Sequence, residues 1–169
     1  DLTSRPIRII DPAMTQRVRR LHVGPPVANM RDDGYEDWSR ALTVRPGPLL
    51  ALRAAWGVLE PRTESGRRIF LHRRAGRRGI VNADRIAAVA REAGLEAVDP
   101  ATLSFAEQRG LFSSAELVVG ATGAVMANYL FMRPGSRIIG LTSDHLRGFI
   151  SPPAMAWISG CAFEYVTGP

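Results

Sequence analysis

The sequence predicts an α/β fold in which a Rossmann-like parallel sheet is flanked by helices. The main observation is that short apolar runs alternate with segments of helical periodicity after residue 66, and that short loops join them. The length of 169 residues suits one domain and is too short for two full ones. The composition, with 46% hydrophobic and 22% charged residues, is ordinary for a globular domain. We therefore divide the chain into residues 1–60, which are poorly patterned, and residues 61–169, which we expect to form the Rossmann-like domain.

The N-terminal segment carries few structural signals. Residues 7–10 have the composition of a short strand, and a helix is expected over residues 49–59, with Arg53 projecting from it. Residues 61–66 contain proline and glycine, which indicates a linker. Because the chain does not begin with Met, we expect it to be part of a longer protein. Residues 1–60 would then hold the end of a missing N-terminal domain and a linker helix.

The rest of the chain alternates between strand and helix signals. Strand candidates are short apolar runs, and helix candidates carry apolar residues on one face. Because helices separate the strands, we expect the strands to be parallel and the crossovers to be right-handed. Strands are expected over residues 68–72, 95–98, 116–120, 137–141 and 162–166, and helices over residues 82–93, 104–114 and 123–132.

Two of these helices have recognisable end signals. Asn82 is a favourable N-cap for the first, and Gly94 is a natural stop because glycine tolerates the left-handed conformation that ends many helices. Ser104 and Glu107 have the spacing of a capping box, in which each side chain accepts a hydrogen bond from the other residue's backbone N–H.

A glycine-rich turn lies between the strand at 116–120 and the next helix, in the stretch VVGATGAVMAN. Gly120 ends the strand, and Gly123 and Ala124 begin the helix at the carboxyl edge of the predicted sheet, where ligands bind in this fold class. Free backbone N–H groups and the helix dipole favour an anion there, and the Thr122 hydroxyl could add a hydrogen bond. A plain tight turn explains the same residues.

Arginine is concentrated directly after the first strand of the domain. All 22 basic residues of the chain are arginine, the net charge is +6, and four arginines occur within six residues: Arg73, Arg74, Arg77 and Arg78. The guanidinium fork suits phosphate oxygens. A solvated basic loop or a nucleic-acid-binding patch would have the same composition.

Other polar candidates are isolated in the sequence. The three histidines are more typical of structural or surface positions than of catalysis: His22, His72 and His145. Core packing is the simpler interpretation of the three tryptophans, Trp38, Trp56 and Trp157. The single cysteine, Cys161, excludes an internal disulfide and a zinc site with several cysteine ligands. The sequence has no apolar run of 18 residues, so no membrane span is expected.

Three segments in order resemble the motifs of glycosyltransferase family 61, which includes proteins of capsular polysaccharide biosynthesis. The segment HRRAGRRGIVN over residues 72–82 is similar to that family's arginine cluster, and LSFAEQ over residues 103–108 resembles its second motif. Residues 115–135, AELVVGATGAVMANYLFMRPG, resemble its glycine-containing third motif. The resemblance covers about residues 67–142 and is weak over residues 1–60.

The resemblance implies a bacterial, two-domain GT-B enzyme that inverts the anomeric centre and serves capsular or exopolysaccharide biosynthesis. Its partners would be a nucleoside-diphosphate sugar and a glycan acceptor, with no cofactor, no tightly held metal and no nucleic acid. Residues 61–169 would be the nucleotide-sugar-binding C-terminal domain of a cytoplasmic protein, with peripheral association to the inner face of the membrane left open. By position, the donor-binding residues would be Arg73, Arg74, Arg78, Asn82, Glu107, Gln108, Gly120, Thr122, Gly123, Ala124 and Asn128. Many members of the family have histidine at the position of Thr122, and threonine cannot supply a positive charge.

The expected chemistry places negative charge on a departing pyrophosphate, which arginines and a helix N-terminus can stabilise. An inverting reaction also needs a general base for the acceptor hydroxyl. No pattern identifies that base; Asp144 and His145, beside a strand end, are the best candidates within the chain, and the missing N-terminal domain is the other source.

Two further functions are compatible with parts of the sequence. A non-catalytic Rossmann-like module that binds anions or nucleic acid would explain the arginines without a sugar. A dinucleotide-dependent oxidoreductase is disfavoured because the sequence lacks G-x-G-x-x-G and the acidic residue that follows it.

Overall fold

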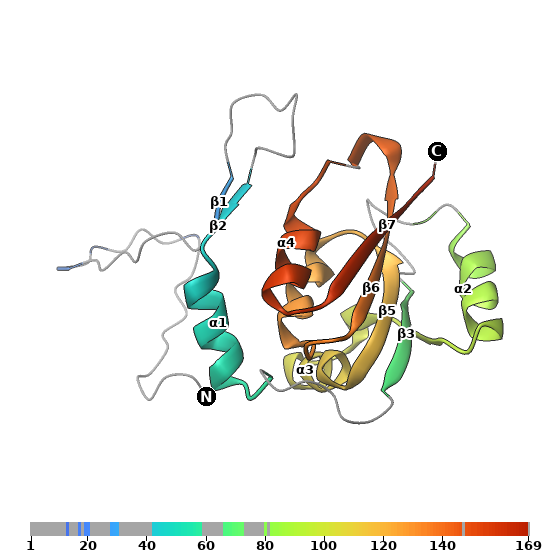
Figure 1. The fold of residues 1–169 in the computed structure, drawn as a ribbon, viewed down its shortest axis with the longest axis horizontal. Helices are drawn as coiled ribbons and strands as arrows, with labels where there is room; N and C mark the ends of the chain where they lie inside the picture. Colours follow the sequence, from blue (N-terminus) through green and yellow to red (C-terminus); the bar gives the residue numbers. More distant parts are fainter. Residues whose placement is uncertain are drawn as a thin grey trace.

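The described part of the chain forms a five-stranded parallel sheet with helices on both faces, preceded by a short hairpin and a helix (Figure 1). The computed structural model describes residues 13, 17, 19–20, 28–30, 42–58, 66–72, 80, 82–146 and 148–168. The expected strand at residues 7–10 lies outside these residues, as do His22, Trp38 and the arginines at positions 73–78.

The sheet has the strand order β4-β3-β5-β6-β7, and all neighbouring strands are parallel. From β3 the chain first moves outward to β4, then crosses back over β3 to β5 and continues outward through β6 to β7. The parallel α/β prediction is therefore confirmed, and each expected strand is found within two residues of its predicted ends. The strands are β3 (Arg67–Leu71), β4 (Glu96–Val98), β5 (Ala115–Ala121), β6 (Arg137–Ser143) and β7 (Ala162–Gly168).

Helices cover the two faces unequally. α2 packs on one face against Phe70, whereas α3, η2 and α4 pack on the other face against Ile69 and Leu71, as alternation along a strand requires (Figure 1). The helices of the domain are α2 (Ala83–Glu92), η1 (Pro100–Thr102), α3 (Phe105–Ser114), η2 (Ala124–Phe131), η3 (Asp144–Leu146) and α4 (Ser151–Ile158).

The segment expected as a helix over 123–132 is a 3₁₀ helix. The buried side chains Met126, Tyr129 and Met132 are spaced by three residues, and each is at most 5% exposed. A 3₁₀ helix has three residues per turn and aligns such side chains on one face, whereas an α-helix would rotate them away from the core. Leu130 and Phe131 are buried as well, so the helix is covered on more than one side.

The helix-end predictions have mixed outcomes. The capping box is confirmed: the Ser104 backbone N–H donates to Glu107 Oε2 at 2.8 Å, and the Glu107 N–H donates to Ser104 Oγ at 3.3 Å. Gly94 ends α2 with φ +76°, as expected. Asn82 does precede α2, but its side chain makes no capping hydrogen bond, so that part of the prediction is wrong.

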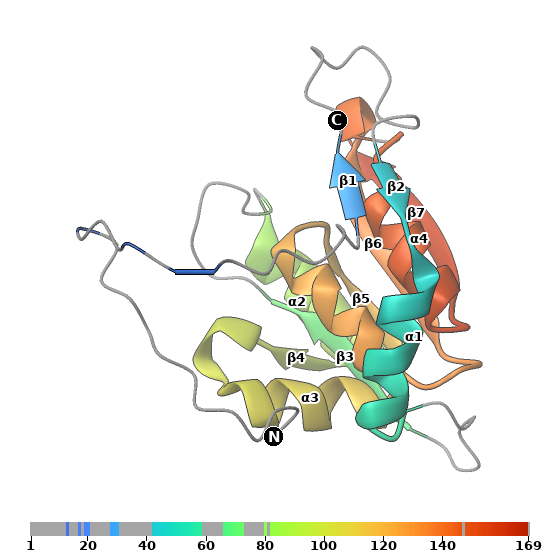
Figure 2. The same ribbon diagram turned by 90° about the vertical axis from the view of Figure 1, so that its left-hand side faces the viewer.

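The N-terminal elements are β1 (Ala28–Met30) and β2 (Leu42–Val44), which form an antiparallel pair, and α1 (Pro46–Ala55). α1 lies against α4 and η2 (Figure 2), and Leu49 shares a small core with Leu130 and Ile158. The helix begins at Pro46 and ends at Ala55, both earlier than in the expected range 49–59. Through its contacts with η2 and α4 it packs as part of the α/β unit.

Arg53 does not project from α1 as expected; it is 1% exposed. Its guanidinium donates to the carbonyl oxygens of Leu130 at 2.6 Å, Met132 at 2.9 Å, Val58 at 2.9 Å and Ser159 at 3.2 Å. These carbonyls lie at the ends of η2, α1 and α4, where backbone acceptors lack partners within their own helix. A buried cation at helix C-termini also complements their dipoles.

The tryptophan prediction holds for one of the two described residues. Trp56 is half-buried, and its ring centroid lies 4.6 Å from that of Phe131. Trp157 is 73% exposed on α4, so core packing is the wrong interpretation there. α4 was not predicted because its first turn contains two prolines, which are tolerated at that position.

Candidate functional site

The strand order places the candidate site at the carboxyl ends of β3 and β5. These strands are neighbours in the sheet, with Leu71 beside Gly120. From β3 the chain continues to β4 at one edge of the sheet, whereas from β5 it continues to β6 in the opposite direction. Such a reversal of strand order opens a crevice in which open α/β sheets bind ligands. The segments expected to hold phosphate, which follow these two strands, therefore start side by side.

Gly120 is required by the sheet itself. A Cβ at this position would lie 2.6 Å from Leu71 Cβ, closer than real side-chain contacts. The close approach of β3 and β5 therefore explains this glycine without a ligand.

The turn after β5 already uses two of its backbone N–H groups. The Thr122 N–H donates to the Leu141 carbonyl at 3.0 Å, and the Gly123 N–H donates to the Met126 thioether sulfur at 2.9 Å. Gly123 has φ 169°, an extended conformation open to any residue. The Thr122 hydroxyl donates to the Thr142 hydroxyl at 3.3 Å.

These contacts leave a limited set of donors for an anion. A thioether is a weak acceptor, so a phosphate oxygen could take its place on the Gly123 N–H. The N–H groups at the start of η2, beginning with that of Ala124, have no acceptor in a preceding turn of their own helix. The turn is therefore capable of binding an anion through two or three N–H groups.

Gln108 and Asn128, expected to contact the donor, are hydrogen-bonded to each other. Asn128 Nδ2 donates to Gln108 Oε1 at 2.8 Å, and Gln108 Nε2 donates to the carbonyls of Pro100 and Leu103 at 3.0 and 3.1 Å. Gln108 lies on α3 and Asn128 on η2, so this pair connects the second motif to the third. The connection was not visible in the sequence, where Gln108 resembled a surface residue as much as a site residue.

Glu107 and Asn82 lie on the surface. Glu107 is exposed at the start of α3, and its hydrogen bonds to the side chain and backbone of Ser104 lower the pKa of its carboxyl group. Asn82 is exposed immediately before α2. Neither residue contacts the turn after β5 in the hydrogen bonds of the described residues.

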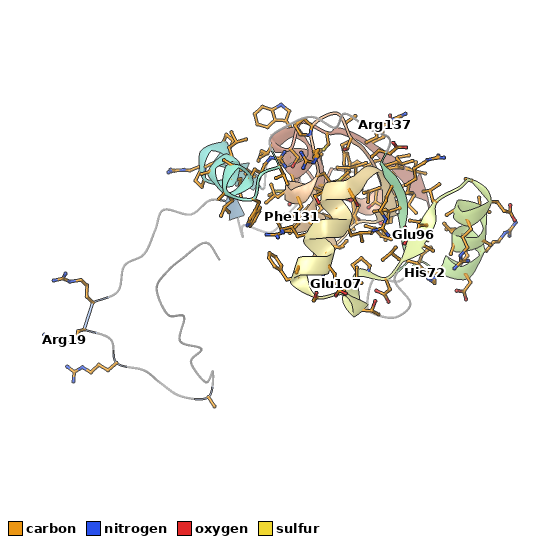
Figure 3. All side chains as sticks on the ribbon, turned by 90° about the horizontal axis from the view of Figure 1, so that it is seen from below. Arg19, His72, Glu96, Glu107, Phe131 and Arg137 are labelled. Carbon is orange, nitrogen blue, oxygen red and sulfur yellow. The ribbon has the colours of Figure 1, made fainter. Side chains whose placement is uncertain are left out.

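His72 directly follows β3 and is buried, with 6% exposure (Figure 3). Its backbone N–H donates to the Val98 carbonyl at 2.8 Å, and its ring lies over Phe70. Nε2 lies 3.5 Å from Oδ1 of Asp84 in the first turn of α2, and has no hydrogen-bond partner within the described residues. The sequence analysis did not single out Asp84. The sequence does show that His72 and Asp84 lie at the two ends of the segment that carries the four arginines.

Among the described residues, neither a metal site nor a general base is identified. Within residues 42–58, 66–72, 82–146 and 148–168, no three His, Cys, Asp or Glu side chains form a group that could hold a metal ion. The expectation of no tightly held metal stays a prediction. Asp144 is exposed on η3 at the end of β6, and the His145 side chain lies outside the described part. No helix of the described chain has both the length and the apolar character to cross a bilayer.

Comparison with known proteins agrees with the resemblance of the three motifs. The family model described as Glycosyltransferase 61 matches residues 8–139, which is most of the chain and extends well upstream of those motifs. No curated protein matches the chain significantly. The chain belongs to glycosyltransferase family 61, and its domain is that of a glycosyltransferase, which takes a sugar donor and an acceptor.

Proposed function

We propose that this family 61 glycosyltransferase transfers a sugar from a nucleoside-diphosphate sugar to a glycan acceptor, with inversion at the anomeric carbon. The donor's diphosphate would bind between the Thr122–Ala124 turn and the pair Arg73–Arg74. One observation carries the proposal: both segments follow strands that are neighbours at the reversal of strand order. Membership of the family supports the reaction class, and the strand order supports this location for the donor.

The proposed chemistry relies on arginine and backbone donors. When the glycosidic bond to the diphosphate breaks, negative charge builds on the leaving oxygen, and preorganised N–H and guanidinium groups stabilise it. Thr122 contributes a hydroxyl and no charge, so the arginines carry the positive charge of this site. No metal is needed in this scheme.

The acceptor and the general base are proposed to come from an N-terminal domain in a GT-B arrangement. An inverting transfer needs a base opposite the leaving group, on the acceptor's side of the sugar. Among the described residues, Asp99 directly follows β4 and Asp144 directly follows β6 at the carboxyl edge; Asp99 accepts a hydrogen bond from the backbone N–H of Ala101, so Asp144 is the candidate offered within this chain. Within a cell, we propose a role in capsular or exopolysaccharide biosynthesis, at the cytoplasmic face of the membrane.

The test is calorimetry with UDP, GDP, CDP and ADP on folded variants. Replacing Arg73 or Arg74 with Ala should remove a charge-assisted hydrogen bond and weaken binding by about 1.5–3 kcal/mol, or about 10- to 150-fold. Gly123→Val should block approach to the turn, and its extended backbone tolerates the new side chain. The matched controls are Arg91→Ala, an exposed arginine in the last turn of α2, and Gly110→Ala in α3.

Two outcomes would overturn the proposal. If Gly123→Val and both arginine variants bind nucleotides as the parent does, the turn is only a turn. If instead the protein binds DNA or RNA with a steep loss of affinity in salt and shows no nucleotide preference, the arginines serve nucleic acid.

A further inference from the structure

Three threonines lie in a row across the carboxyl ends of β5, β6 and β7, which are neighbours in the sheet (Figure 1). Thr142 of β6 is paired in register with Thr167 of β7. Thr122, the first residue after β5, lies beside Thr142, and the two hydroxyl oxygens are 3.3 Å apart. All three side chains are half-buried. We name Thr122, Thr142 and Thr167 the threonine row.

The threonine row stands where one face of the sheet changes from apolar to polar. Every second residue of a strand points to the same face. On β7 the residues beneath Thr167 are Tyr165 and Phe163, and Phe163 packs against the core that η2 and α4 cover. Hydroxyl groups therefore replace aromatic rings at the last step of the strand, at the carboxyl edge where this fold class binds ligands.

Two contacts fix the orientation of the Thr122 side chain. Its methyl carbon lies over Gly140, where an added Cβ would come within 3.3 Å of that methyl. Its hydroxyl oxygen bonds to the hydroxyl of Thr142. A β-branched side chain with both of its Cβ substituents placed in this way has little rotamer freedom left. Gly140 therefore makes room for Thr122 to direct its hydroxyl along the row.

The threonine row has hydrogen-bonding capacity that the protein leaves unused. Each hydroxyl offers one donor and two acceptor sites. Among the residues that the structure describes, the bond between Thr122 and Thr142 is the one hydrogen bond that the three hydroxyls make. Hydroxyl groups are uncharged, whereas a diphosphate is bound best by charged donors. The row therefore suits a neutral group that carries several hydroxyls.

We propose that the threonine row is a subsite for a hydroxylated ring of the donor, its ribose or its transferred sugar. Thr122 belongs both to the row and to the turn that is proposed to bind the diphosphate, so a ring attached to that diphosphate would lie next to the row. The hydroxyls of such a ring both donate and accept hydrogen bonds, as threonine hydroxyls do. The subsite rests on the proposed function, because the diphosphate has to bind at this turn for a ring to reach the row.

Calorimetry on Thr142→Val and Thr167→Val tests the subsite. Valine keeps the β-branched shape and favours strands, so both variants should fold. The probes are the nucleotide that the parent binds most tightly among UDP, GDP, CDP and ADP, the glucose ester of that nucleotide, and its 2′,3′-dideoxy form. Loss of one hydrogen bond between uncharged groups should weaken binding of a probe that carries the recognised ring by about 2- to 12-fold.

The pattern across the three probes identifies the ring. If the row binds ribose, both variants weaken the nucleotide and its glucose ester alike, and they bind the dideoxy form as the parent does. If the row binds the transferred sugar, the variants weaken the glucose ester and leave the other two probes unchanged. The matched control is Thr102→Val, which removes a threonine hydroxyl after β4, at the opposite edge of the sheet, and should bind every probe like the parent.

Three results would overturn the subsite. The first is binding by both variants that equals the parent's for every probe. The second is an equal loss for all three probes, because cross-strand threonine pairs also stabilise sheets and such a loss would assign the row to the sheet or the turn. The third is a parent that binds none of the four nucleoside diphosphates, in which case the proposed donor site fails and the row loses its role with it.

Discussion

Replacing Arg53 with Met should cost this domain a large part of its stability. The change removes four hydrogen bonds from a cation to backbone carbonyls and leaves those buried oxygens without their donor. At about 1.5–3 kcal/mol for each bond to a charged group, the upper bound is roughly 6–12 kcal/mol. Burial removes the guanidinium from water, which lowers the pKa of Arg53 and offsets part of the stabilisation that these hydrogen bonds provide. We therefore expect a loss of about 3–5 kcal/mol, the range found when one partner of a buried charged contact is removed.

Urea unfolding followed by circular dichroism measures this loss. With a slope of about 2 kcal/mol per molar urea, the midpoint should fall by roughly 1.5–2.5 M while the slope stays constant. The matched control is Arg67→Met on β3, because Arg67 also makes short bonds, to Glu96 at 2.6 Å, but is exposed. That exposed ion pair should contribute at most about 1 kcal/mol. If Arg53→Met costs no more than Arg67→Met, the four carbonyl contacts do not stabilise the fold and the reasoning from burial is wrong.

Three further predictions concern other contacts. Gly120→Ala should destabilise the domain by about 1–3 kcal/mol, because the new Cβ would overpack against Leu71 of β3. Gly110→Ala, with no atom within 4 Å of the new Cβ, should stabilise it by about 0.5–1 kcal/mol. Equal effects of the two changes in urea unfolding would contradict the close approach of β3 and β5 at Gly120. In a double-mutant cycle, Gln108→Ala and Asn128→Ala should couple by about 0.5–3 kcal/mol in nucleotide affinity or stability, and strictly additive effects would show that the bridge does not matter. Burial raises the pKa of Cys161 to about 11, so its thiolate is scarce in the folded protein at pH 8, and labelling with a disulfide reagent should be at least about a hundredfold slower than in urea. Folding should correspondingly lose stability as pH rises from the unfolded thiol's range toward 11, and rapid labelling of the native protein at pH 8 would contradict this assignment.

The sheet could be predicted because its signals are local. Each strand is a short apolar run between breakers, and strands separated by helices must be parallel, so β3 to β7 followed from pattern alone. The capping box was equally visible, because Ser104 and Glu107 are three residues apart and need only each other.

The errors arose where distant segments decide a residue's environment. Arg53 looked like an exposed helix residue, since nothing near it in the sequence shows that the ends of η2 and α4 leave carbonyls without donors. The buried side chains of η2 pack against the sheet and against α1 and α4, which lie far from η2 in the sequence.

The candidate site was predictable in place and less so in detail. The carboxyl edge followed from the α/β pattern, but the hydrogen bond between Gln108 and Asn128, and the approach of Asp84 to His72, needed the relative placement of helices. Sequence motifs mark which residues matter together; they do not distinguish a group that touches the donor from one that touches its neighbour.

The contacts of Arg53 also bear on the order in which the chain folds. They join residues that are 77, 79 and 106 positions apart, so they can form only after η2 and α4 have been placed. Closing such long loops has a high entropic cost, so these contacts form late in folding. Contacts that form late mainly slow unfolding and do little to speed folding. The docking of α1 onto the assembled sheet should therefore slow unfolding of the domain. Trp56 packs on Phe131, so its fluorescence should report this docking step.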